Sequence, residues 1–278
     1  MTEAESLGAR RAKTVVQIDE FNGRGIGVPT VGLFSNLGRS EYQEILSLAR
    51  VRSFVRNEVL FSQGEPITRF MLIQSGSVKV SHTSFHGEEV ILWIIGSGHT
   101  VGAVAEHQER LHSCSALALE GGKSLVWPFE RFQMLAARHP QLQANVGAIL
   151  TGRLQELEQR FSEVATDNAE RRLALAVLRL VRSVGKAHQK GVRISVSGEE
   201  LAQIIASTIF TVSRTLARWD KSGLVNRSRQ SIVIHDVSQL EGLAAERSRR
   251  AVRRKILDEM MVERGLTDIG SVTMDLKP

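Results

Sequence analysis

Residues 197–225 read SGEELAQIIASTIFTVSRTLARWDKSGLV. Ser197 is followed three residues later by Glu200, a capping box that predicts a helix running to about Ile205. After the short turn 206–208, Thr208 is the expected N-cap of a second helix over 209–220. Two short helices joined by a tight turn predict a helix-turn-helix.

The second of these helices has two chemically different faces. Val212, Leu216 and Trp219 form an apolar inner face, whereas the outer face is polar and basic. The first turn of such a helix can reach base edges, and basic residues further on can meet phosphates. Residues 231–234, SIVI, follow as the strand of an expected wing. The residues expected to contact DNA are Ser207, Thr208, Ile209, Phe210, Thr211, Ser213, Arg214, Arg218, Lys221 and Arg227.

Upstream, residues 52–128 consist of short apolar runs divided by turns such as 75–77 and 96–98. Many short strands at this spacing predict a β-barrel or jelly roll. The pattern becomes helical at residue 129, so the fold class is α+β: an N-terminal β-roll, a long helix and a C-terminal winged helix-turn-helix.

The long helix is expected over about 141–166. Its apolar positions recur at spacings of four and three, which is typical of a seam between two helices. The seam predicts a dimer interface, although an apolar stripe packed on its own domain has the same pattern. The seam residues are Leu150, Leu154, Leu157, Phe161 and Val164.

Charge is unevenly distributed along the chain. Residues 1–169 carry 16 Lys/Arg and 18 Asp/Glu, whereas residues 170–278 carry 20 and 12. A basic C-terminal part suits a polyanion such as DNA, or simply a solvated face. With no run of about 18 apolar residues and no signal-peptide core, we expect a cytoplasmic protein with no membrane partner. The single cysteine, Cys114, fits a reducing compartment.

Four sequence motifs, in the same order and at similar distances, resemble those of the cyclic-AMP receptor protein / fumarate–nitrate regulator (Crp/Fnr) family. They are residues 60–66 (LFSQGEP), 76–80 (GSVKV), 98–102 and 201–224. The resemblance covers about residues 33–243. It implies a homodimeric, DNA-binding transcription regulator with a cyclic-nucleotide-binding-like effector domain, a palindromic DNA site and RNA polymerase as a partner.

The resemblance divides the chain into five parts. Residues 1–30 form a flexible arm, 31–138 the effector roll, 139–167 the dimerisation helix, 168–243 the DNA-binding domain and 244–278 a basic C-terminal extension. In that extension, we leave open whether the arginine-rich helix contacts DNA or docks on its own domain.

The family's ligand pocket departs from the pattern of cyclic-nucleotide binders. The pair that holds the ribose reads Gly102-Ala103, without the carboxylate, and the pair that holds the phosphate reads His112-Ser113, without the arginine fork. The positions on the long helix where hydroxyls are expected to contact the base are Leu157 and Glu158, and neither side chain has a hydroxyl. These three changes argue against cyclic AMP, so the effector is another molecule or none.

The two metal cofactors found in the family fit this sequence to different extents. One cysteine excludes an iron–sulfur cluster held by four cysteines of this chain. The histidines of the roll show no metal-ligand spacing, so we expect no metal site, and haem stays an open alternative. Cys114 is either an inert buried thiol or a redox sensor.

The reading helix also departs from the family, because Ile209 and Phe210 stand where well-studied members have an Arg-Glu or a Val-Glu pair. Ser213 and Arg214 match the fumarate–nitrate branch. We therefore expect an altered half-site, and keep as an alternative a sensor or scaffold that has lost specific DNA binding. No nucleophile–base arrangement or phosphate loop indicates an enzyme.

Overall fold

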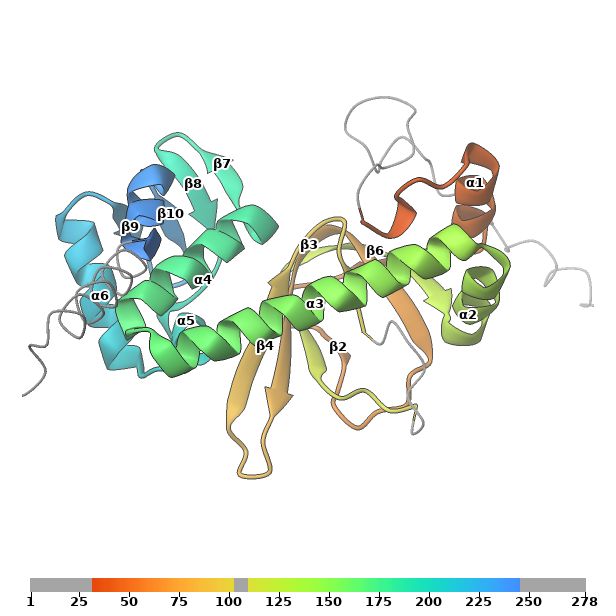
Figure 1. The fold of residues 1–278 in the computed structure, drawn as a ribbon, viewed down its shortest axis with the longest axis horizontal. Coiled ribbons are helices and arrows are strands. Elements are labelled where there is room, and N and C mark those ends of the chain that lie inside the picture. The colour runs from red at the N-terminus through yellow and green to blue at the C-terminus, as the bar shows by residue number, and fades with distance from the viewer. Residues whose placement is uncertain (1–31, 103–109, 246–278) are drawn as a thin grey trace, which may run out of the picture.

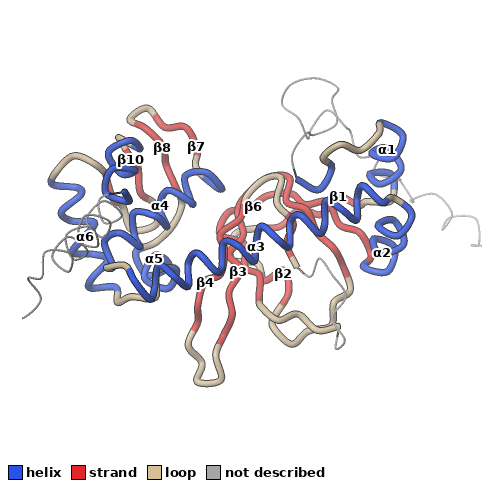
Figure 2. Tube along the Cα trace, in the orientation of Figure 1, coloured by secondary structure: helices blue, strands red, loops and turns tan. Residues whose placement is uncertain are grey.

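The computed structural model describes residues 32–102 and 110–245. It has an N-terminal roll, a long helix that crosses the roll, and a C-terminal domain of helices and a small sheet (Figure 1). Figure 2 shows helices and strands in both lobes, and the expected α+β fold is confirmed. The expected N-terminal arm, Ala103 and most of the basic C-terminal extension lie outside the described residues.

Two long, bent strands organise the roll. β3 and β6 pair with each other over most of their length, and each carries a different short partner on either side of its bend. The first half of β3 pairs with β5 and its second half with β4, whereas β6 pairs first with β2 and then with β1. The bounds are β1 Arg50–Phe54, β2 Val59–Phe61, β3 Arg69–Thr83, β4 Glu89–Ile95, β5 Thr100–Val101 and β6 Ser115–Pro128.

The bend in β3 lies at Gly76, where the register to β6 shifts. Gly76 has a φ of +84°, and a Cβ there would lie 2.8 Å from the carbonyl oxygen of Gly121. Only glycine combines this backbone conformation with so close an approach. The bend allows one strand to serve both halves of the roll.

Helices close one end of the roll around a cluster of aromatic side chains. The 3₁₀ turn Gly32–Phe34, α1 (Arg39–Ser47) and α2 (Phe129–Arg138) pack with the start of α3 (Pro140–Thr166). Trp127 is fully buried there, and its indole N–H donates to the carbonyl oxygen of Ile45 at 2.8 Å. The first turn of α1 is capped by the Glu41 carboxylate, which accepts from the Gly38 amide at 2.7 Å.

The C-terminal domain combines helices with a four-stranded antiparallel sheet in the order β7-β8-β10-β9. Its elements are α4 Ala169–Val184, β7 Lys186–His188, β8 Gly191–Ile194, α5 Gly198–Ile204, α6 Ile209–Lys221, β9 Val225–Arg227 and β10 Ile232–Ile234. The expected wing is the β9–β10 hairpin. β7 pairs with β8 as an antiparallel hairpin that forms the other edge of this sheet.

The two lobes share one core. Ile91 and Ile94 of β4 are buried in the same cluster as Leu173, Val177 and the helix-turn-helix side chains. The hydroxyl of Ser183 on α4 also donates to the carbonyl oxygen of Ile94 at 2.9 Å. The C-terminal domain is therefore docked on the outer side of β4.

Candidate DNA-binding surface and effector region

Both helices of the helix-turn-helix begin at the predicted caps. The Ser197 hydroxyl accepts from the Glu200 amide at 3.1 Å, and the Glu200 carboxylate accepts from the Ser197 amide at 2.7 Å. Ala206 makes the turn with a φ of +49°. The Thr208 hydroxyl then caps α6 by accepting from the Thr211 amide at 3.3 Å. These caps satisfy first-turn amides and so fix where α6 starts.

The inner face of α6 anchors the helix to its domain. Val212, Leu216 and Trp219 are buried, as predicted. The indole N–H of Trp219 donates to the Glu170 carboxylate on α4 at 3.1 Å. With this face fixed, the outer face has a defined direction.

The outer face of α6 is open. Ser213, Arg214 and Lys221 are exposed, and Phe210 keeps 82% of its surface accessible. Arg218 is exposed as well, but its guanidinium lies 3.2 Å from the Glu170 carboxylate. Arg214 makes no ion pair within the described ranges, so its charge is available to a partner.

A groove of about 450 Å³ runs between α6 and the wing. Ile209 and Ser213 line one side, and Arg227 and Arg229 line the other. Arg227 is held against α6, because its guanidinium donates to the Ser213 carbonyl oxygen at 3.4 Å and lies 3.8 Å from Asp220. Arg229 was missed as a site residue, although its place between two wing strands was a usable signal.

The candidate effector residues come together only in part. The His112 ring is buried and stacks on Phe61 with 3.8 Å between ring centroids. Gly102 adjoins both rings: a Cβ there would lie 3.5 Å from each. Burial lowers the pKa of His112, the nearby Glu65 carboxylate opposes this shift, and Arg69 adds to it.

Two other candidates of this group, Ser113 and Leu157, are more exposed than His112. Ser113 is exposed, and its carbonyl oxygen accepts from the His82 ring at 2.9 Å. Leu157 lies half-buried on α3. Beside Ser113, burial raises the pKa of the Cys114 thiol, which disfavours the reactive thiolate.

The predicted seam of α3 is largely uncovered within the described chain. Phe161 keeps 77% of its surface exposed and Leu154 keeps 58%. Leu150 and Val164 are also exposed. On another side of α3, Glu163 is buried and pairs through both carboxylate oxygens with Arg179 of α4 at 2.8 Å. One side of the helix thus packs on its own chain while the seam faces outward.

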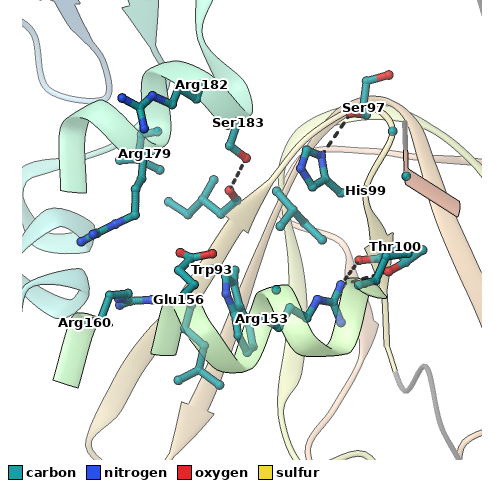
Figure 3. Close-up of a pocket in the computed structure, with 18 of the residues that line it drawn as sticks. Trp93, Ser97, His99, Thr100, Arg153, Glu156, Arg160, Arg179, Arg182 and Ser183 are labelled. Carbon is teal, nitrogen blue, oxygen red and sulfur yellow. Dashed lines mark hydrogen bonds between the residues drawn. The ribbon is translucent and has the colours of Figure 1, made fainter. Parts of the chain in front are cut away.

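A second cavity lies between the two lobes, and no motif in the sequence predicts it. It has a volume of about 600 Å³ and is walled by the roll, α3 and α4. Figure 3 shows Arg153, Glu156 and Arg160 rising from α3 and Arg179, Arg182 and Ser183 extending from α4. Trp93, His99 and Thr100 supply the roll side.

A nucleotide-binding-like roll, a long helix and a winged helix-turn-helix with an open basic face define a class of DNA-binding regulators. Residues 51–139 match the cyclic nucleotide-binding domain family, and residues 171–243 match the Crp-like helix-turn-helix domain family. The chain belongs to the Crp/Fnr family of transcription regulators.

Curated relatives match along most of their length. The chain is 28% identical over 212 residues to the cyclic AMP receptor protein of Thermus thermophilus, covering 76% of this chain and 96% of the relative. It is 26% identical over 199 residues to electron transport regulator A of Shewanella oneidensis, covering 71% and 79%.

Solved structures share the fold at low identity. The c-di-GMP responsive global regulator CLP of Xanthomonas campestris aligns with a TM-score of 0.61 at 19% identity, covering 72% of this chain and 100% of that one. A CooA mutant of Carboxydothermus hydrogenoformans aligns with a TM-score of 0.59 at 20% identity, covering 78% and 98%. No described helix is long and apolar enough to cross a membrane.

Proposed function

We propose that this regulator binds a palindromic duplex as a homodimer, with one α6 in each of two successive major grooves. The open outer face of α6 is the observation that carries this proposal. The buried inner face holds α6 rigidly, while Ser213, Arg214 and Lys221 remain free to meet DNA. The groove beside Arg227 and Arg229 fits a phosphate backbone next to the helix.

The homodimer part of the proposal is supported by the seam of α3. Four of its five apolar residues are exposed, and such a stripe is costly in water unless a partner covers it. A second copy of the same helix offers the matching spacing. The two recognition helices would then sit one helical turn of DNA apart, about 34 Å.

The effector part of the proposal is that the roll binds a molecule other than cyclic AMP, or none. His112 stands at the position expected for the phosphate-holding arginine. It stacks on Phe61 instead of presenting a guanidinium fork, and burial keeps its ring neutral at pH 7 by lowering its pKa. A neutral ring cannot replace the bidentate charge contact to a phosphate. Regulation would proceed through contact with RNA polymerase or by blocking its access.

The test is selection of bound duplexes from a random pool at fixed salt, with purified full-length protein and no added ligand. We expect a palindromic enriched site. If Arg214→Ala loses this site and Arg131→Ala keeps it, recognition of the DNA sequence is assigned to α6. Arg131 is an exposed arginine on α2, remote from the helix-turn-helix.

One observation favours a second candidate function, a sensor or scaffold without specific DNA binding. Phe210 is 82% exposed at the first turn of α6, where the family reads bases, and an exposed phenyl ring there also suits a protein partner. No enriched site in the selection, with or without cell extract, would favour this candidate.

A further inference from the structure

The cavity between the lobes lies outside the interior of the roll. Its apolar wall comes from both domains and from α3, through Leu92, Ile149 and Leu180 among others. A volume of about 600 Å³ falls in the range of small-molecule sites. A molecule bound here would touch the roll and the DNA-binding domain at once.

The charge of the cavity is strongly positive. Four arginines line it, against one carboxylate, that of Glu156. Arg179 is neutralised by Glu163, and Arg182 lies 3.9 Å from Glu241 on the exposed rim. The other two, Arg153 and Arg160, form no ion pair with a carboxylate within residues 32–102 and 110–245.

Backbone contacts fix those two guanidinium groups without neutralising them. Arg153 donates to the carbonyl oxygen and the hydroxyl of Thr100 at 2.6 and 3.0 Å. Arg160 donates to the carbonyl oxygens of Ile91 at 2.9 Å and Ile204 at 3.0 Å, and to that of Leu92. Burial lowers the pKa of both arginines, which is the mark of a charge deprived of water.

The roll contributes an aromatic ring with an unused donor. The Arg153 guanidinium lies over the Trp93 ring, 5.6 Å from its centroid. The Trp93 indole N–H is buried and has no hydrogen-bond partner among the described residues. Buried donors are normally paired, so this one points to a missing acceptor. Figure 3 shows Trp93 beside Glu156 and Arg153 on the floor of the cavity.

We propose that this cavity binds a small organic anion, a carboxylate or phosphate attached to an aromatic or apolar body. The anionic group would accept hydrogen bonds from the remaining N–H donors of Arg153 and Arg160. The planar guanidinium group matches the geometry of both carboxylate and phosphate. The body would lie against Ile149, Leu180 and Trp93. The consequence for regulation rests on the proposed function: a ligand that touches both lobes stabilises their docked arrangement and so changes DNA affinity.

A glycine of α3 provides a way to block the cavity. Gly152 lines it, and a Cβ at that position would meet nothing within 4 Å. Gly152→Leu therefore adds a bulky side chain at the cavity wall without a backbone clash, and leucine has a higher helix propensity than glycine. Gly147→Leu is the matched control, because a Cβ at Gly147 on α3 would also meet nothing within 4 Å, but Gly147 does not line the cavity.

The experiment is isothermal titration of the full-length protein, without DNA, with phenyl phosphate, benzoate and neutral phenol. We expect one or both anions to bind in the micromolar to millimolar range and more tightly than phenol. Gly152→Leu and Arg153→Met should each weaken that binding roughly tenfold or more, since each removes steric room or a charge-assisted bond. Gly147→Leu and Arg131→Met should bind as the wild type does.

The proposal fails if neither anion binds at millimolar concentration, if phenol binds as tightly as the anions, or if Gly152→Leu leaves binding unchanged. Because the titration contains no DNA, its result is independent of whether α6 reads a specific site. A second titration with the selected duplex tests regulation: unchanged duplex affinity at saturating anion would overturn the coupling while leaving the site itself intact.

Discussion

The outer face of α6 and the interior of the roll both carry residues at the family's binding positions, but the structure places these residues differently. Around α6, the expected residues share one open face, and their basic groups stay accessible. In the roll, His112 is buried on Phe61 and Ser113 is turned outward. A surface that reads DNA needs rigid, exposed charges, whereas the interior of a sensing domain needs only to fit the molecule that it holds.

The largest effect is expected from disrupting the proposed dimer interface along the seam of α3. Leu154→Glu combined with Phe161→Glu places two charges on the exposed seam and should give a monomer. Affinity for a palindromic duplex should fall by roughly 100-fold or more, because the second half-site is no longer held at high effective concentration. Analytical ultracentrifugation and gel shift measure the two outcomes.

The matched control for the seam is Met134→Glu, which adds the same charge at an exposed apolar residue of α2. It should remain dimeric and bind the duplex normally. A Leu154→Glu/Phe161→Glu protein that still sediments as a dimer would show that the interface lies elsewhere.

The next effect concerns base reading itself. Arg214→Ala should lower affinity for the selected site by about 1–3 kcal/mol, roughly 5- to 150-fold, with the oligomeric state unchanged. Fluorescence anisotropy with specific and scrambled duplexes measures the change. A parallel loss on both duplexes would reassign Arg214 from a base contact to a phosphate contact.

A smaller loss of DNA affinity is expected for a substitution at Arg218, whose guanidinium forms an ion pair with the Glu170 carboxylate at 3.2 Å. Arg218→Ala should weaken all duplexes alike by a few fold and lower the slope of log affinity against log salt by about one, as for a single phosphate contact. The salt titration separates it from Arg214. If the loss were confined to the selected site, Arg218 would be a reading residue instead.

Local signals explain how much of the fold and of the DNA surface the sequence predicts. The caps Ser197 and Thr208 act within three residues, and the apolar positions 212, 216 and 219 follow the helical period, so both helices and their buried face are predictable. The bend at Gly76 and the pairing of β3 with both β4 and β5 depend on distant partners and are not.

The roll interior and the junction of the lobes lie beyond such signals. Residues 90–95 form a continuous apolar run, which indicates burial on both faces but not that the C-terminal domain covers one of them. The stacking of His112 on Phe61 joins residues 51 positions apart along the chain, and the cavity at Arg153 needs three separate elements. Contacts of this kind leave no periodic pattern in the sequence from which they could be predicted.

The smallest effect tests the other side of the comparison, the buried His112. Because burial lowers its folded-state pKa, the unfolded chain binds more protons below the ordinary histidine pKa of about 6.5, so this residue's contribution to stability is complete above that pH and is lost as pH falls. His112→Phe keeps the ring stack without the titrating group, and should lose less stability between about pH 7 and pH 5 than the wild type does. Chemical denaturation at each pH measures this, with His86→Phe, at an exposed hairpin position, as the control that keeps the wild-type dependence of stability on pH.

Duplex affinity at pH 7 should be the same in the wild type, His112→Phe and His86→Phe, because a neutral His112 and a Phe fill the same place in the roll. If His112→Phe changed duplex affinity tenfold, the interior of the roll would be coupled to α6. The two regions would then no longer differ in their effect on DNA affinity.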